Sequence, residues 1–281
     1  MNDSGIHLSL QQFPADEIEK RCALIELFDD WQAAMREALP PDEKHLADGF
    51  VWDGFYPYYF SQPTKILFVG RESLGLAHSD YLDVILNCYR KEKQIGITGG
   101  SRKLNAALYH ARMLHISYGV IHGFINWGEI PWAEKIGDTF ASENGISFAM
   151  LNLSKLSNPS AEQSSANWGL INSAVTASGD FLRREVEILD PDVVVTMNSG
   201  NYLSSLGDVK TVEGRDLDRS VSAEPGDKYL LTSGASSSFL INTWHLSARK
   251  RNVEDFYEPI CKAIVGAMGT SGLITPNCHP R

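Results

Sequence analysis

Short, continuous apolar runs most constrain what this chain can fold into. Residues 65–70 read KILFVG and residues 192–197 read DVVVTM, and neither run alternates with polar residues. Such a strand is buried on both faces, as in a parallel sheet whose two sides are covered by helices. Further strands are predicted at 146–153 and at the two candidates 229–232 and 239–243, between which lies a serine-rich turn.

Helical periodicity fills the intervals between these strands. Helices are predicted over 15–38, before Pro40, over 172–189, before Pro191, from Ser199 for a short stretch, and over 253–268. Strands that alternate with helices indicate an α/β fold, here three-layer α/β/α with a mostly parallel four-stranded central sheet. We expect one domain over residues 1–281, with its core at about 60–268, an N-terminal helix and aromatic loop at 1–59, and a flexible tail at 270–281.

The net charge limits the classes of partner that the chain can bind. A net charge of −10 argues against a protein that coats nucleic acid, although a basic groove on an acidic body stays compatible with a DNA enzyme. The candidate basic clusters are Arg102-Lys103, Arg183-Arg184 and Arg249-Lys250-Arg251. The N-terminus lacks a signal-peptide pattern and no apolar run approaches the length of a membrane span, so we expect a cytoplasmic protein without a membrane partner. The four cysteines are scattered, which favours free thiols and predicts neither a metal nor another cofactor.

Polar side chains follow each predicted strand at its carboxyl end, where ligands bind in open parallel sheets. Glu72 follows the first strand, Asn152 lies near the end of the second, Ser199 and Gly200 follow the third, and His245 follows the last. A carboxylate, an amide, a helix start and a histidine are therefore expected at one edge of the sheet.

Taken in order, these segments resemble the motifs of the uracil-DNA glycosylase superfamily. VGRESLG resembles the first motif, with Glu72 at the catalytic acid position, and FAMLNLSKLSNP resembles the second, with Asn152 as the residue that reads the base. FLRREVEILDPDVVVTMNSG is similar to the third, as found in the thermophile-type branch, and TWHLSARK resembles the closing motif, with His245 at its key position. The matched segments span roughly residues 65 to 251, most of the chain.

The chain also departs from the family pattern. Ser73 and Leu246 stand where the family has proline, and the iron–sulfur cysteines of the thermophile-type branch are missing. In the classical uracil enzymes a bulky aromatic two places after the catalytic acid blocks substituents at C5 of the base. Here that position is Leu74, followed by Gly75, which predicts room for a C5-substituted pyrimidine. Bulky modified cytosines of phage DNA, the substrate of a phage-defence member of the superfamily, are one such class.

The resemblance gives these residues roles in breaking an N-glycosidic bond. The reaction develops positive charge on the sugar and negative charge on the leaving base. The Glu72 carboxylate would stabilise the cation or orient water, and His245 would donate an N–H to the O2 oxygen of the base. Asn152 would bind the pyrimidine edge, with Gly70 and Leu74 beside it.

Two further sets of residues would contact the rest of the DNA. Phosphate contacts are predicted at Ser199, Gly200, Ser247, Arg249, Lys250 and Arg251, with Ser154 and Lys155 as an additional pair. Aromatic faces for a flipped base are offered by Phe55, Tyr56, Tyr58, Tyr59, Phe60 and Trp127, although such a loop is as often core.

Three functions stay open from the sequence. The first is a monofunctional DNA glycosylase, a monomer that leaves an abasic site in bacterial or phage DNA, in base excision repair or antiviral defence. The motifs contain no obvious lysine for a Schiff base, which favours that single activity. The second is a non-catalytic relative that binds nucleic acid or a nucleotide, favoured by the acidic composition and the missing prolines. The third is an unrelated α/β enzyme of small molecules, weakened by the absence of G-x-S-x-G, Walker A and G-x-G-x-x-G motifs.

Overall fold

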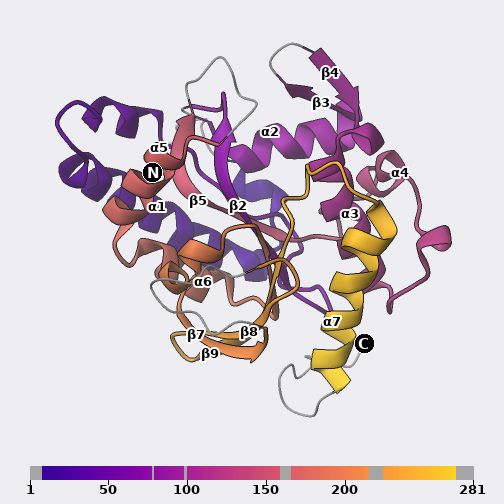
Figure 1. The fold of residues 1–281 in the computed structure, drawn as a ribbon. Helices are drawn as coiled ribbons and strands as arrows, with labels where there is room; N and C mark the ends of the chain where they lie inside the picture. The colour runs from indigo at the N-terminus through magenta and orange to yellow at the C-terminus, as the bar shows by residue number, and fades with distance from the viewer. Residues whose placement is uncertain (1–7, 78, 98–99, 159–165, 215–223, 270–281) are drawn as a thin grey trace.

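A mixed sheet forms the centre of the computed structural model, which describes residues 8–77, 79–97, 100–158, 166–214 and 224–269. Within those ranges the sheet has seven strands (Figure 1). Across the sheet they are β1 (Gly54–Phe55), β5 (Ala149–Asn158), β2 (Ile66–Leu74), β6 (Val193–Met197), β9 (Ser236–Thr243), β8 (Lys228–Ser233) and β7 (Asp208–Glu213).

The four inner strands β5, β2, β6 and β9 pair in parallel, whereas β1, β8 and β7 pair antiparallel at the two edges. The α/β class predicted from the apolar runs is therefore confirmed, but the prediction of a four-stranded sheet is wrong. Both candidates for the last strand are strands, because the serine-rich segment between them closes a β8–β9 hairpin. Strand β7 was not predicted because it is largely exposed and carries no apolar run.

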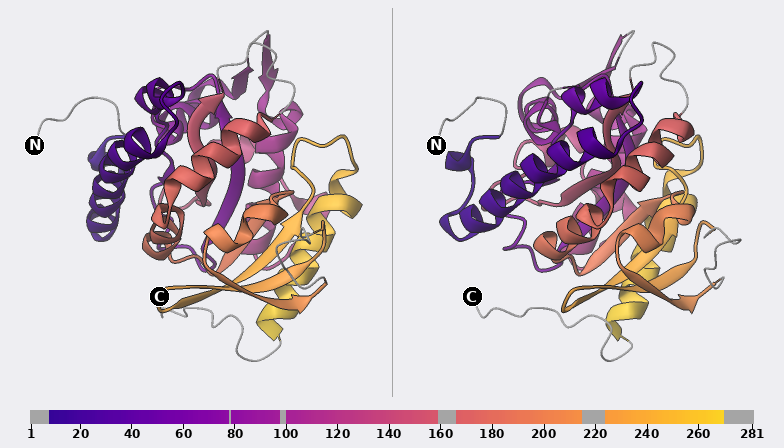
Figure 2. Two further views of the ribbon diagram at one scale, coloured as in Figure 1. Left: turned by 60° about the vertical axis from the view of Figure 1, so that its left-hand side comes forward. Right: turned by 90° about the vertical axis from the view of Figure 1, so that its left-hand side faces the viewer.

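Helices cover both faces of the sheet (Figure 2). On one face, α1 (Ile18–Ala38) packs against α5 (Trp168–Ser178) and α6 (Phe181–Leu189). On the other, α3 (Leu108–Ile121) packs against α7 (Glu258–Gly269). The remaining α-helices of the described ranges are α2 (Tyr81–Asn87) and α4 (Ala133–Gly137), and β3 (Gln94–Ile97) pairs with β4 (Gly100–Lys103) in a separate hairpin.

The predicted helix boundaries need one correction. The helix expected over 172–189 is two helices, because Gly179 adopts a positive φ of 56° that ends α5 before α6 begins. The helix expected over 15–38 is confirmed as a 3-10 turn at Ala15–Glu17 followed by α1. The helix expected over 253–268 is confirmed as a π turn at Val253–Tyr257 followed by α7. The tail at 270–281, with Cys278, lies outside the described residues.

The segment that precedes β2 belongs to the same hydrophobic core as the sheet. Trp31 of α1 is fully buried, stacks on Phe181 of α6 at 5.5 Å, and donates its indole N–H to Ser178 at 3.2 Å. In the aromatic loop, Phe55, Tyr56 and Tyr59 are fully buried. The sequence allows two interpretations of the aromatic loop, either as a set of stacking faces for a flipped base or as part of the core. These three rings belong to the core. No helix of the described ranges is long and apolar enough to cross a membrane.

Three charged side chains form a buried ionic cluster beneath the carboxyl end of β5. The Lys155 ammonium lies 2.5 Å from Asp53 Oδ1 and 2.7 Å from Glu185 Oε2, and all three side chains are fully buried. Burial and the neighbouring Asp53 carboxylate hold the pKa of Glu185 well above its usual range. The predicted phosphate contact through Lys155 is wrong, because this ammonium is paired inside the protein and does not reach the surface.

Candidate functional site

Strand register brings the predicted site residues to one edge of the sheet. On one side of β2, Gly70 lies opposite Asn152 of β5, so that Glu72 extends two residues beyond this row. On the other side, β6 carries the row to β9, where Met197 lies opposite Thr243. His245 then follows two residues beyond Thr243. We call Glu72, Asn152 and His245 the rim group.

Glu72 is held by one of its two carboxylate oxygens. Oε1 accepts hydrogen bonds from the Asn158 side chain at 3.1 Å and from the Asn167 backbone N–H at 3.0 Å. Oε2 is buried and has no hydrogen-bond partner among the described residues. Burial raises the pKa of Glu72, while these two hydrogen bonds and the Arg71 guanidinium lower it. The result is an oriented carboxyl group with one oxygen left for a ligand or water.

Asn152 is held in place by a hydrogen bond to Asp53 of the buried ionic cluster. Its backbone N–H donates to Asp53 Oδ2 at 2.7 Å, while Oδ1 of the same carboxylate binds Lys155. Its side-chain Oδ1 lies only 2.7 Å from where a Cβ on Gly70 would be, so any larger residue at Gly70 would displace the amide. Within the described part of the chain, the buried Nδ2 atom has no hydrogen-bond partner.

Tyr109 of α3 lies beside Gly70, Asn152 and His245, and the sequence motifs did not identify it. Its hydroxyl lies 2.9 Å from the position of a Cβ on Gly70 and donates to Met150 Sδ at 3.7 Å. Its ring stacks on His245, with centroids 5.5 Å apart and planes 27° apart. Because Asn152 is only 3% exposed, a base reaches its amide only after neighbouring side chains move.

His245 is a neutral hydrogen-bond donor. The Ser247 backbone N–H lies 3.3 Å from Nδ1 and donates to it, which assigns the ring proton to Nε2. The Ser247 hydroxyl lies 2.7 Å from the same nitrogen. Burial, with a smaller contribution from the Arg71 cation, lowers the pKa of His245 to about 4. The imidazole is therefore uncharged at neutral pH and keeps an N–H to offer.

A second residue that the motifs missed, Arg112 of α3, shapes the loop after His245. The buried guanidinium stacks on Phe256 at 3.8 Å, and burial lowers its pKa to about 10. Its hydrogen bonds go to Leu246 O (2.6 Å), Ala248 O (2.8 Å), Lys250 O (2.9 Å) and Asn252 Oδ1 (2.9 Å). A planar fork of this kind fixes several carbonyls at once, so the 246–252 loop is held in one conformation without regular secondary structure.

The predicted phosphate contacts divide into exposed and covered residues. Ser247, Arg249, Lys250 and Arg251 are exposed, although Arg251 pairs with Asp255 at 3.3 Å. Ser199 is buried and its hydroxyl donates to Met197 O at 3.4 Å. Gly200 begins a 3-10 helix of six residues, Gly200–Ser205. Leu74 ends β2 opposite Asn158, and Gly75 follows with a positive φ of 66°.

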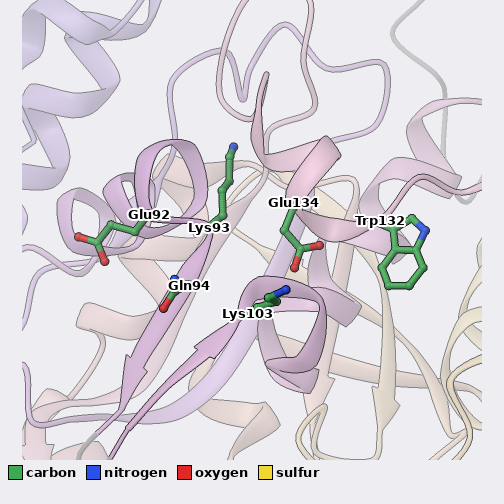
Figure 3. A pocket seen from close by; sticks show the side chains of 6 residues that line it. All are labelled: Glu92, Lys93, Gln94, Lys103, Trp132 and Glu134. Atoms are coloured by element: carbon green, nitrogen blue, oxygen red, sulfur yellow. The ribbon is translucent and has the colours of Figure 1, made fainter.

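Other parts of the described chain offer little competing chemistry. No group of three or more His, Cys, Asp or Glu in the described ranges is placed to hold a metal ion. A shallow pocket of about 350 Å³ lies where α4 meets the β3–β4 hairpin (Figure 3). Its lining residues are Glu92, Lys93, Gln94, Lys103, Trp132 and Glu134. None of them belongs to the rim group.

In comparisons with known proteins, no family model and no curated protein matches the chain.

Proposed function

We propose that the chain is a monofunctional DNA glycosylase that hydrolyses the N-glycosidic bond of a flipped pyrimidine and leaves an abasic site. The observation that carries this proposal is the state of the polar atoms at the edge of the sheet. Glu72 and Asn152 each keep one buried polar atom without a partner among the described residues, and His245 keeps its Nε2 proton. Buried polar atoms elsewhere, such as Tyr56 Oη and Glu185 Oε1, also lack a hydrogen-bond partner among the described residues, so the support lies in the gathering of the three rim residues at one edge of the sheet.

Each member of the rim group then has one task. The ionised Glu72 carboxylate stabilises the positive charge that develops on the sugar, or orients the attacking water. His245 donates its Nε2 proton in a hydrogen bond to the O2 oxygen of the leaving base, which needs a donor and no net charge. Asn152 binds the edge of the base with its amide. Lys155 forms no Schiff base, because its ammonium is held by two carboxylates.

The proposed substrate is uracil or a C5-substituted pyrimidine, including the bulky modified cytosines of phage DNA. Support comes from the first motif, where Leu74 and Gly75 occupy the place of the aromatic residue that excludes C5 substituents in the classical uracil enzymes. We place the enzyme in the cytoplasm, as a monomer acting on bacterial or phage DNA. Its role there is base excision, either in repair or in antiviral defence.

An abasic-site assay tests the proposal. The protein is incubated with oligonucleotides that carry uracil, a thymine mismatch or a C5-modified cytosine, and alkali-labile breaks are counted. We expect breaks with at least one substrate and a loss of about 10²- to 10⁴-fold in Glu72→Gln, the usual contribution of a positioned acid or base. Breaks that Glu72→Gln leaves unchanged would contradict the assignment of Glu72. Uracil cut far faster than every modified base would contradict the C5-substituted substrate alone.

One observation favours a second candidate, a non-catalytic protein of the same fold that binds nucleic acid or a nucleotide. Asn152 is only 3% exposed, so its amide is not open to a base in this structure. Binding of DNA without excision of any of the bases tested would favour this candidate.

A further inference from the structure

Two exposed tryptophans flank the rim group. Trp168 is 44% exposed and Trp244 is 40% exposed. Trp168 follows Asn167, whose backbone N–H binds Glu72, and Trp244 directly precedes His245. A large apolar side chain left partly in water loses part of the favourable free energy of burial. Each of the two rings lies next to a residue that is, or that binds, a candidate catalytic residue. Together they therefore mark a contact surface at this edge of the sheet.

Each of these rings carries a cation. The Arg71 guanidinium lies 4.7 Å from the ring centroid of Trp168, and the Lys250 ammonium lies 4.0 Å from that of Trp244. The ring of Tyr202 lies nearly parallel to that of Trp168, at 9° and 6.3 Å between centroids. We call the first set (Arg71, Trp168, Tyr202) the Trp168 platform and the second (Lys250, Trp244) the Trp244 platform.

The charges around the rim group do not favour binding to the phosphates of duplex DNA. Arg251, the last residue of the basic run, is already paired with Asp255 and with Glu254. The whole chain has a net charge of −10, which repels the phosphate backbone at long range. Affinity for duplex DNA comes mainly from neutralised phosphates, whereas aromatic rings interleaved with a few cations are the usual surface for unpaired bases.

We propose that the enzyme takes its target in a single strand, with the nucleobases on either side of the flipped nucleotide stacked on the Trp168 and Trp244 platforms. Arg71 and Lys250 then face the adjoining phosphates, while the flipped base enters between the two platforms. The inference rests on the proposed function for the identity of the flipped nucleotide. The proposed stacking of flanking bases can be tested without any excision, because ordinary bases are the ligands of the platforms.

Fluorescence anisotropy with a labelled single strand of about 20 nucleotides, its duplex, and an equally long strand of abasic backbone tests the inference. We expect tighter binding of the single strand than of the duplex. Trp168→Ala and Trp244→Ala should each weaken single-strand binding about 5- to 100-fold, the effect of losing one base–aromatic stack. Neither change should weaken binding of the abasic strand, which has phosphates and no bases.

Matched variants separate stacking from general damage. Trp132 is 72% exposed in the pocket of Figure 3, so Trp132→Ala should bind all three ligands as the unmodified protein does. Trp168→Phe keeps a ring and should retain most of the affinity. Equal binding of duplex and single strand, or equal effects of Trp132→Ala and Trp168→Ala, would overturn the inference.

The same experiments distinguish failure of the inference from failure of the proposed function. Excision that depends on Glu72 but is equally fast on both DNA forms, with no effect of either tryptophan, would overturn the inference and leave the glycosylase proposal intact. Single-strand binding that depends on Trp168, without excision of any base, would support the platforms and contradict the glycosylase.

Discussion

The buried ionic cluster and the rim group meet on β5, which carries both Lys155 and Asn152, but they differ in how their charged groups are paired. In the cluster, Lys155 has a carboxylate on either side and no access to solvent. In the rim group, one atom of Glu72 and one of Asn152 lack a partner among the described residues. Glu185 Oε1 in the cluster also lacks a hydrogen-bond partner, so an unpaired atom alone does not separate the two regions. What differs is the charge: the Lys155 ammonium is already held by carboxylates and has nothing left to bind with.

Asp53 joins the two regions. One oxygen of its carboxylate binds the Lys155 ammonium, and the other accepts the backbone N–H of Asn152. The cluster therefore does more than neutralise charge. It fixes the middle of β5, and with it the place of the amide that would read a base.

The largest effect on stability is expected from Lys155→Met. The substitution keeps the apolar stem but leaves two buried carboxylates without their cation, which typically costs about 3–5 kcal/mol of the free energy of unfolding. Urea denaturation at neutral pH measures this loss. Lys250→Met, at an exposed position, serves as the control and should change stability by less than about 0.5 kcal/mol. A loss below about 1 kcal/mol for Lys155→Met would mean that the cluster is not what holds this part of β5.

Asn152→Leu is expected to separate function from stability. Leucine has nearly the same shape and removes a buried amide nitrogen that lacks a partner, so the free energy of unfolding should stay unchanged or rise by about 1 kcal/mol. Excision or base-dependent binding should fall about 100-fold, because the site then offers no hydrogen bond to the base. Thermal melting and single-turnover kinetics on the same preparation check both halves. A variant that is clearly destabilised but fully active would show that Asn152, like the buried ionic cluster, serves stability and not base binding.

The sequence predicts the parallel strands well because burial on both faces leaves a solid apolar run such as DVVVTM. The predicted strand ends are less accurate: His245 does follow β9, but Glu72 and Asn152 lie within β2 and β5, because both strands run further than their apolar runs. Helix α3 was not predicted, because it is buried on nearly all sides and so has no polar face to give a helical period. Tyr109 and Arg112, which lie beside the site and hold its loop, were missed with it.

Lys155 shows a second limit of sequence reasoning. In FAMLNLSKLSNP it stands three residues after Asn152, next to a predicted site, and a lysine there is typical of a phosphate contact. Its two partners come from residues 53 and 185, about 100 and 30 positions away along the chain. Only the folded arrangement shows that its charge is already neutralised.

The smallest effect expected is a shift in the pH dependence of excision. In the proposed mechanism the ionised form of Glu72 is the active one, and burial raises the pKa of Glu72 above the usual 4.5. The rate should therefore rise with pH through that pKa and then level off. His245 adds no further change near neutrality, because its pKa of about 4 keeps it uncharged there. Arg71 lowers the pKa of Glu72, so Arg71→Gln should move the acid limb to higher pH.

Single-turnover rates between about pH 4 and pH 8 measure this shift, with Arg71→Lys as the control that keeps the positive charge and should keep the limb in place. If both variants shift the limb equally, the stacking of Arg71 on Trp168 sets the position of Glu72, and its charge matters little. If neither shifts it, the limb belongs to a group outside the rim. A shift in Arg71→Gln alone would show that Glu72 titrates in the reaction and that the charge of Arg71 sets its pKa. Glu185 differs, because its protonation is governed by burial and by its partners within the cluster.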